Sequence, residues 1–215
     1  MVPLRHFSSE IVERCLYLHD LLSPIVSDEP IPQEWGPLTS TFLLAMAMPL
    51  IVIPMERIAD NQRVSPIGDR DRDPRLTKQI NDILNAPFKK SILRGTGEWF
   101  HFPTNKNAKP EEWLGPEVYE LAKRQAAEVL ITRRVLTGLR HALSHGNVLY
   151  LTAQGYATER GPVEMFAFMW DMRKGREVIG HNVLVVRQDH FAELIKNWGT
   201  LISNSVSMKH LLRAA

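Results

Sequence analysis

The stretch that decides the predicted fold is Glu117–Asn147, EVYELAKRQAAEVLITRRVLTGLRHALSHGN, which reads as the longest helix of the chain. Pro116 suits the first turn of a helix, and Gly146 suits the left-handed residue that follows a last helical turn. We therefore expect one helix from Glu117 to His145. Its last turns carry leucines at helical spacing, namely Leu136, Leu139 and Leu143. One face of the helix should accordingly lie against the protein's own core.

The opposite face of this helix carries the chemically useful groups. His141 and His145 are four residues apart and therefore share a side. Further back the same side is apolar, with Ala126, Ala127 and Leu130. These small residues and Gly138 would let another helix approach closely, which indicates a second contact surface. We expect this face to bind a second copy of the chain across a two-fold axis, so that two sets of Arg and His side chains meet.

Apolar periodicity predicts further helices before this one, over residues 8–23, 38–60 and 75–86. The first should end at Ser23-Pro24. The second contains the apolar run Phe42–Met55, so it should be central, and kinked or broken near Pro49. Residues 61–75 read as a charged surface loop. Residues 95–116 read as an irregular region whose aromatic side chains fasten it to the core, namely Trp99, Phe100, Phe102 and Trp113.

After Asn147 the spacing of apolar residues changes from that of a helix to that of a strand. Three short strands are predicted over residues 148–151, 164–170 and 183–186, with glycine-containing turns between them. A final helix should begin near Asp189, a good N-cap, and end at Ser203, before a loose tail. The predicted fold is one mainly α domain over residues 1–215. It has a helical body over residues 1–146 and a small antiparallel sheet with a last helix over 147–205.

Composition limits the classes of protein that fit. Hydrophobic residues make up 44% of the 215 residues and charged residues 23%, as in ordinary soluble proteins. The net charge of +2 permits a nucleic-acid partner without demanding one. The lone cysteine, Cys15, reads as a buried helix residue and fits a reducing cytoplasm. We expect no secretion signal and no membrane span, because the run Phe42–Met55 is shorter than the roughly 20 residues that a span needs.

The residues Arg140, His141 and His145 suit the cleavage of RNA without a metal. Such cleavage needs a base for the 2′-OH proton, an acid for the leaving 5′-oxygen and a cation for the phosphorane. Histidine fits both proton roles because its ordinary pKa, about 6.5, lies close to working pH. Arginine stays charged and its planar fork matches phosphate oxygens. The carboxyl end of a helix also favours imidazolium, which helps to hold one histidine as the acid.

The residues Arg140-His141-x-x-x-His145 resemble the R-x4-6-H motif of the HEPN superfamily, and the context RHALSHGN late in a long helix is typical of that family. The resemblance implies a helical bundle that dimerises through the 117–145 helix. It implies a metal-independent endoribonuclease of the toxin–antitoxin, defence or RNA-processing kind, with an antitoxin protein as a further partner. Arg140 and His145 would be the catalytic pair, and His141 the assisting polar residue. The strand-rich segment after Asn147 resembles bacterial members that append a small sheet and a last helix.

Three alternatives stay open from the sequence. His141 and His145 could ligate zinc, but no clear third ligand accompanies them, so we expect neither a metal nor a cofactor. A HEPN-like module could bind RNA or a nucleotide without cutting it. The histidines could also simply cap the end of a helix. An RNA-binding role is predicted for the polar residues near the motif, namely Arg133, Arg134, Ser144 and Asn147, and the basic pair Arg133-Arg134 could bind RNA phosphate.

Overall fold

An antiparallel sheet of four strands organises the fold. The computed structural model of the chain describes residues 7–28, 38–59, 74–109, 114–116, 127–159 and 161–213. Within them the strands are β1 (Trp99–Asn105), β2 (Val148–Leu151), β3 (Met165–Lys174) and β4 (Glu177–Arg187). Their order across the sheet is β1-β4-β3-β2, so β1, from the middle of the chain, pairs with the last strand. Gly175, with φ of 64°, supplies the left-handed residue that the tight turn between β3 and β4 needs.

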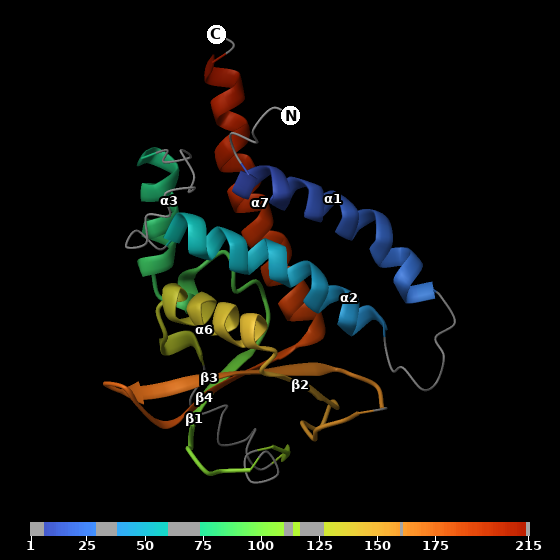
Figure 1. Ribbon diagram of the computed structural model, residues 1–215. Helices are drawn as coiled ribbons and strands as arrows, with labels where there is room; N and C mark the ends of the chain where they lie inside the picture. Colours follow the sequence, from blue (N-terminus) through green and yellow to red (C-terminus); the bar gives the residue numbers. More distant parts are fainter. Residues whose placement is uncertain are drawn as a thin grey trace.

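The helices lie together on one side of the sheet (Figure 1). They are α1 (Phe7–Asp28), α2 (Leu38–Ala47), α3 (Pro74–Asn85), α6 (Thr132–His145) and α7 (Gln188–Arg213). Two π-helical turns, Met48–Val52 and Met55–Ala59, continue α2. Short 3-10 turns stand at Phe88–Lys90 (η3) and Ala127–Val129 (η4). Of the helices, α6 lies next to the sheet and contacts β3 (Figure 1).

Alternation along β4 shows how the sheet is covered on both faces. Leu184 and Val186 are buried in the large cluster that the helices form. Val183 and Val185 point the other way, into a smaller cluster with Phe100 and other side chains. Because successive strand residues face opposite sides of a sheet, a strand buried on both faces is apolar at nearly every position, as VLVV is in β4.

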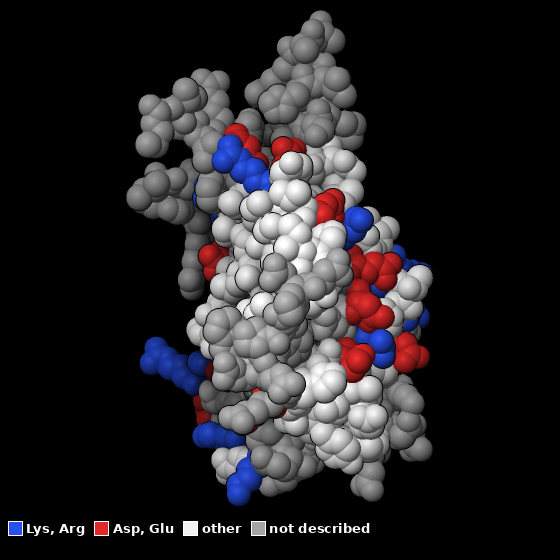
Figure 2. All heavy atoms as spheres, turned by 90° about the vertical axis from the view of Figure 1, so that its right-hand side faces the viewer, with Lys and Arg blue, Asp and Glu red and all other residues white. Residues whose placement is uncertain are grey.

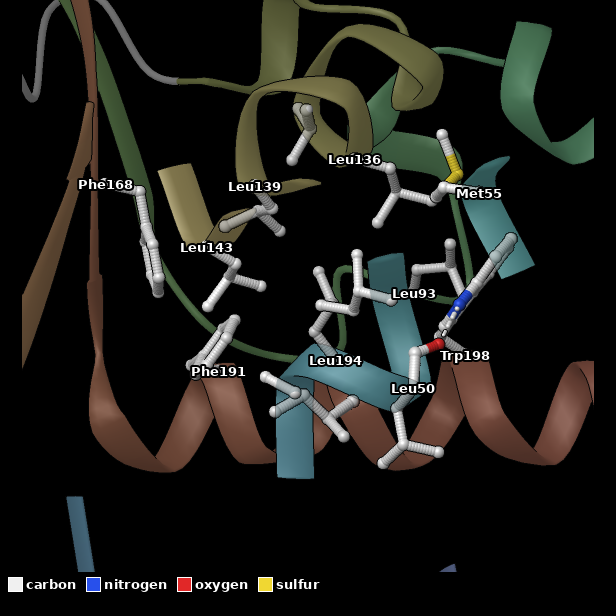
Figure 3. Close-up of a cluster of buried hydrophobic side chains, with 14 of the residues drawn as sticks. Leu50, Met55, Leu93, Leu136, Leu139, Leu143, Phe168, Phe191, Leu194 and Trp198 are labelled. Atoms are coloured by element: carbon white, nitrogen blue, oxygen red, sulfur yellow. Dashed lines mark hydrogen bonds between the residues drawn. The ribbon is translucent and has the colours of Figure 1, made fainter. Parts of the chain in front are cut away.

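The main core lies between α6, α7 and the π-helical continuation of α2 (Figure 3). Trp198 of α7 is fully buried there, and its Nε1–H donates to the backbone oxygen of Leu50 at 2.8 Å. In a regular helix that oxygen would accept from residue 54, but Pro54 has no N–H. The indole therefore gives this carbonyl a donor in place of the α-helical one that Pro54 cannot supply.

The prediction of a mainly α, HEPN-like helical bundle is wrong. The described chain is an α+β fold, in which five α-helices pack on a four-stranded antiparallel sheet. The strand missing from the prediction is β1, which lies in the region expected to be irregular. Three of the four aromatic residues expected to fasten this region to the core are buried, namely Trp99, Phe100 and Phe102, and the fourth, Trp113, lies outside the described residues. Pro103 obscured the strand in the sequence, but an edge strand such as β1 tolerates a proline.

The prediction of one continuous helix from Glu117 to His145 is also wrong. Residues 117–126 lie outside the described part, and α6 begins only at Thr132. Before it, Ile131 is extended, with φ of −73° and ψ of 147°, and forms a bridge with Pro87. Two backbone bonds hold this break, Phe88 N–H to Leu130 O at 2.7 Å and Thr132 N–H to Ala86 O at 3.0 Å.

The break changes what the apolar side of the predicted helix contacts. Ala127 and Leu130 are buried in the chain's own core. Gly138 is buried as well, and a Cβ added to it would meet the Trp170 ring at 2.7 Å. Ala126 lies outside the described residues. The described small and apolar residues from which a partner-facing helix was predicted are therefore covered within the chain.

Other predictions hold with changed boundaries. The helix over 75–86 and the three strands after Asn147 are confirmed, and the π-helical turn Met48–Val52 disrupts α2 at Pro49 as expected. However, α1 continues through Pro24 to Asp28, and α7 continues past Ser203 to Arg213. The charged loop predicted over 61–75 falls largely outside the described residues. The segment Leu38–Arg57 forms a helix long and apolar enough, by length and composition, to cross a membrane, which the apolar run alone did not indicate.

Candidate functional site

The site is built on one narrow stripe of α6. Arg134, Gly138, His141 and His145 follow one another at intervals of four, three and four residues, which places them within one side of a helix. Gly138 lies against Trp170 of β3. The two histidines come one and two turns later, in the last part of the helix. Gly146, with φ of 68°, ends the helix directly after His145 and donates to Leu143 O.

A pocket of about 610 Å³ opens where this stripe meets the outer half of β3. It is lined by His141, His145, Asn147, Trp170, Asp171 and Arg173. The first three of these residues were predicted from the sequence. The last three were not predicted, because no motif surrounds them and only the pairing of β3 in the sheet carries them beneath the end of α6.

The two imidazoles lie parallel, with ring centroids 6.2 Å apart and planes inclined by 10°. Arg140 Nη2 donates to His141 Nε2 at 3.1 Å, and Arg140 Nη1 lies 3.9 Å from Glu56 Oε1. A guanidinium can only donate hydrogen bonds. His141 Nε2 must therefore be the acceptor, which makes His141 a neutral imidazole with its proton on Nδ1.

The electrostatics of the pocket agree with a neutral His141. Burial lowers the pKa of His141, and the nearby Arg140, His145 and Arg173 lower it further, whereas the carboxylate of Asp171 acts in the opposite direction. Because the ordinary value is about 6.5, a lowered pKa leaves the ring uncharged at neutral pH. His141 can then present an N–H donor to an anion.

Asp171 and Arg173 form an ion pair at the wall of the pocket. Arg173 donates to Asp171 Oδ2 from Nη2 at 2.6 Å and from Nε at 3.1 Å. His181 of β4 approaches the other carboxylate oxygen, at 3.6 Å. Both members of the pair are partly exposed, so the pair is worth little to stability. Its position, however, puts a guanidinium beside the two histidines.

The structure places the four predicted RNA contacts differently from one another. Arg133 donates to Asn81 at 2.8 Å and to Asn85 at 3.3 Å, so it ties α6 to α3. Arg134 reaches Asn182 at 3.4 Å on the sheet. Ser144 is exposed and does not line the pocket, whereas Asn147 does. Of the four side chains, only that of Asn147 shares the pocket with His141 and His145.

A second polar cluster lies on the sheet beside the pocket. The buried Asn182 accepts at Oδ1 from His101 Nε2 at 3.0 Å, and His101 stacks on Trp170 with centroids 5.9 Å apart. Burial lowers the pKa of His101, the nearby Arg134 lowers it too, and the bond with Asn182 acts in the opposite direction. This cluster holds one wall of the pocket, because Trp170 belongs to both.

The lowered pKa of His101 predicts a dependence of stability on pH. In the unfolded chain this histidine binds a proton below about pH 6.5, whereas in the folded chain it binds one only at a lower pH. The free energy of unfolding should therefore fall as the pH drops from about 7.5 to about 5.5. In His101→Gln, which keeps an N–H donor for Asn182 but does not titrate, the fall should be smaller. Urea unfolding at both pH values measures the difference, and equal slopes for the two proteins would contradict the prediction.

Metal ligation gains no support from the described residues. Within them no three His, Cys, Asp or Glu side chains are grouped so as to hold a metal ion. Figure 2 shows one face of the molecule, on which Lys and Arg are interspersed with Asp and Glu, without a continuous basic stripe among the coloured residues.

The fold and the pocket together define an α+β protein with an open site of two histidines and neighbouring arginines. Comparisons with protein-family models, with curated proteins and with solved structures find no match to this chain. A function for this chain must therefore be proposed from the chemistry of the pocket.

Proposed function

We propose that this protein is a metal-independent endoribonuclease whose active site is the pocket of His141 and His145. One observation carries the proposal: the Arg140–His141 hydrogen bond leaves a neutral N–H donor beside a second, exposed imidazole in an open pocket. A phosphodiester meets there a proton carrier, a hydrogen-bond donor and the guanidinium of Arg173. These are the groups that attack by the 2′-hydroxyl requires.

The reaction follows from these positions. His145 takes the proton of the 2′-hydroxyl, and the 2′-oxygen forms a bond to the adjacent phosphorus. His141 Nδ1–H and Arg173 stabilise the negative charge that develops on the phosphoryl oxygens. The bond from phosphorus to the 5′-oxygen breaks, and the leaving oxygen takes a proton from water. The hydroxide that this leaves takes the proton from His145, which returns to its neutral form. The products are a 2′,3′-cyclic phosphate and a 5′-hydroxyl.

Arg140 acts in this mechanism through His141. Its side chain does not line the pocket, and it lies between Glu56 and His141. By donating to Nε2 it selects the tautomer with a proton on Nδ1, and its charge favours the neutral ring. This assignment keeps the three motif residues in one site but makes Arg140 a positioning residue.

The substrate provides the first test. We expect a single-stranded RNA to be cut in EDTA, and the same oligonucleotide with 2′-deoxy residues throughout to stay intact, because DNA lacks the attacking hydroxyl. Mass spectrometry of the products should find the 2′,3′-cyclic phosphate. Cleavage of the deoxy oligonucleotide, or loss of RNA cleavage in EDTA, would exclude the mechanism. RNA that is bound but not cut would assign the pocket to a binding module instead.

A further inference from the structure

The indole of Trp170 is held between α6 and β1. On one side its six-membered ring lies against the α-carbon of Gly138, where an added Cβ would be only 2.7–2.8 Å from three ring atoms. On another side it stacks on His101, with planes inclined by 29°. His101 is in turn bonded to Asn182, the cross-strand partner of Trp170. The ring therefore cannot easily move away if the helix approaches.

Contacts along the same stripe of α6 show that the helix is also held at this distance from the sheet. Arg134, one turn before Gly138, bonds to the same Asn182 oxygen as His101. One turn after Gly138, His141 lines the pocket together with Trp170. Only a glycine at position 138 lets the ring approach this closely, and a glycine inside a helix costs about 1 kcal/mol of stability relative to alanine. The packing of the ring against the helix must offset this cost.

We propose that Trp170 and Gly138 form a spacer that sets the distance between the end of α6 and the sheet, and thereby positions His141 and His145 over Asp171 and Arg173. The catalytic meaning of this spacer rests on the proposed nuclease function, but the placement of His141 does not. Residues 141 and 145 follow Gly138 on the same rigid helix. A change in the distance between Gly138 and the sheet therefore moves both imidazoles together. Trp170 is a positioning residue in this scheme, because it acts through the histidines.

Gly138→Ala tests the spacer directly. The new methyl group forces α6 away from Trp170, which exposes His141 and moves it relative to Arg173. Burial is the main cause that lowers the pKa of His141, so this pKa should rise toward its ordinary value when the ring is exposed. Arg140 and His145 move with His141 on the same helix, so their effect on its pKa stays the same. NMR titration of the His141 ring measures this without any RNA. Cleavage should fall by about 100-fold, the scale of a 1 Å misplacement in an active site.

A rescue variant separates positioning from general damage. Phenylalanine at position 170 lacks the distal ring atoms that the new methyl group would meet, so Gly138→Ala combined with Trp170→Phe should regain the His141 titration of the unaltered protein and most of its cleavage. Gly199→Ala is the matched control. It also adds a methyl to a buried helical glycine, 2.8 Å from a Leu16 side-chain atom in another part of the core, and should leave His141 unchanged.

The outcomes distinguish this inference from the proposed function. An unchanged His141 titration in a folded Gly138→Ala protein overturns the spacer, and so does a double variant that titrates like Gly138→Ala. A shifted titration that the double variant reverses supports the spacer even if no RNA is cut, in which case only the nuclease proposal fails.

Discussion

Replacing His145 by alanine is expected to lower the rate of RNA cleavage by about 10²–10⁴-fold, the range that a general base contributes. The loss should fall on kcat with little change in KM, because His141 and Arg173 still bind the phosphate. His145 is exposed at the end of α6, so the protein should remain folded. Single-turnover cleavage of RNA in EDTA measures the effect. Added imidazole should restore part of the activity by replacing the missing base.

His19→Ala provides the matched control for His145→Ala. His19 lies on α1, stacks on Phe42 and lines a different pocket, so its loss removes an imidazole without touching the proposed site. We expect its cleavage rate to stay within about twofold of the unaltered protein, since surface changes remote from a site act weakly. Equal rates for His145→Ala and the unaltered protein would remove His145 from the mechanism. Such a result would also point to a contaminating ribonuclease.

Trp198→Ala is expected to have the largest effect on stability. The side chain is fully buried between α7 and the π-helical continuation of α2, and truncating a buried tryptophan typically costs about 3–5 kcal/mol. The variant also leaves Leu50 O without the indole donor, which adds about 1–3 kcal/mol if no water replaces it. The free energy of unfolding, measured by urea denaturation, should fall by at least the first amount. Many domains of this size would then be largely unfolded.

Trp198→Phe separates the two contributions. Phenylalanine keeps most of the buried ring but cannot donate to Leu50, so its cost should be well below that of alanine and should reflect mainly the lost hydrogen bond. If Trp198→Ala loses less than about 1 kcal/mol, the core between α7 and α2 is not closed in the way described. If the two variants are equally unstable, the hydrogen bond rather than the packing holds the π-helical segment.

Local signals predicted the elements whose formation depends on near neighbours. The strand over 148–151 was predicted with its observed bounds, because its apolar residues are followed by a turn at Gly155, which has φ of 83°. The start of α7 was predicted to within one residue: the helix begins at Gln188, so Asp189 lies in its first turn rather than at the N-cap, and its Oδ1 accepts from the His190 N–H at 2.9 Å. The motif that placed His141 and His145 at the end of a helix was equally local, since Gly146 ends α6.

Elements that depend on distant partners could not be predicted in this way. The strand β1 contains Pro103 and the polar His101, and it is stabilised by pairing with β4, about 80 residues later in the chain. The break at Ile131 exists because the chain there bonds to Pro87 and its neighbours rather than to the next helical turn. In both cases a long-range contact outweighs a local preference of a few tenths of a kcal/mol per residue.

The candidate site likewise contains residues placed by local contacts and residues placed by distant ones. The sequence by itself determined that Arg140, His141 and His145 lie together on the last turns of a helix, because helical spacing and a terminating glycine act within a few residues. Only the tertiary structure decided that Trp170, Asp171 and Arg173 complete the pocket, since the sheet register carries β3 beneath α6. That register is set by burial of apolar side chains on both faces of the sheet, a property of the whole fold that no short segment contains.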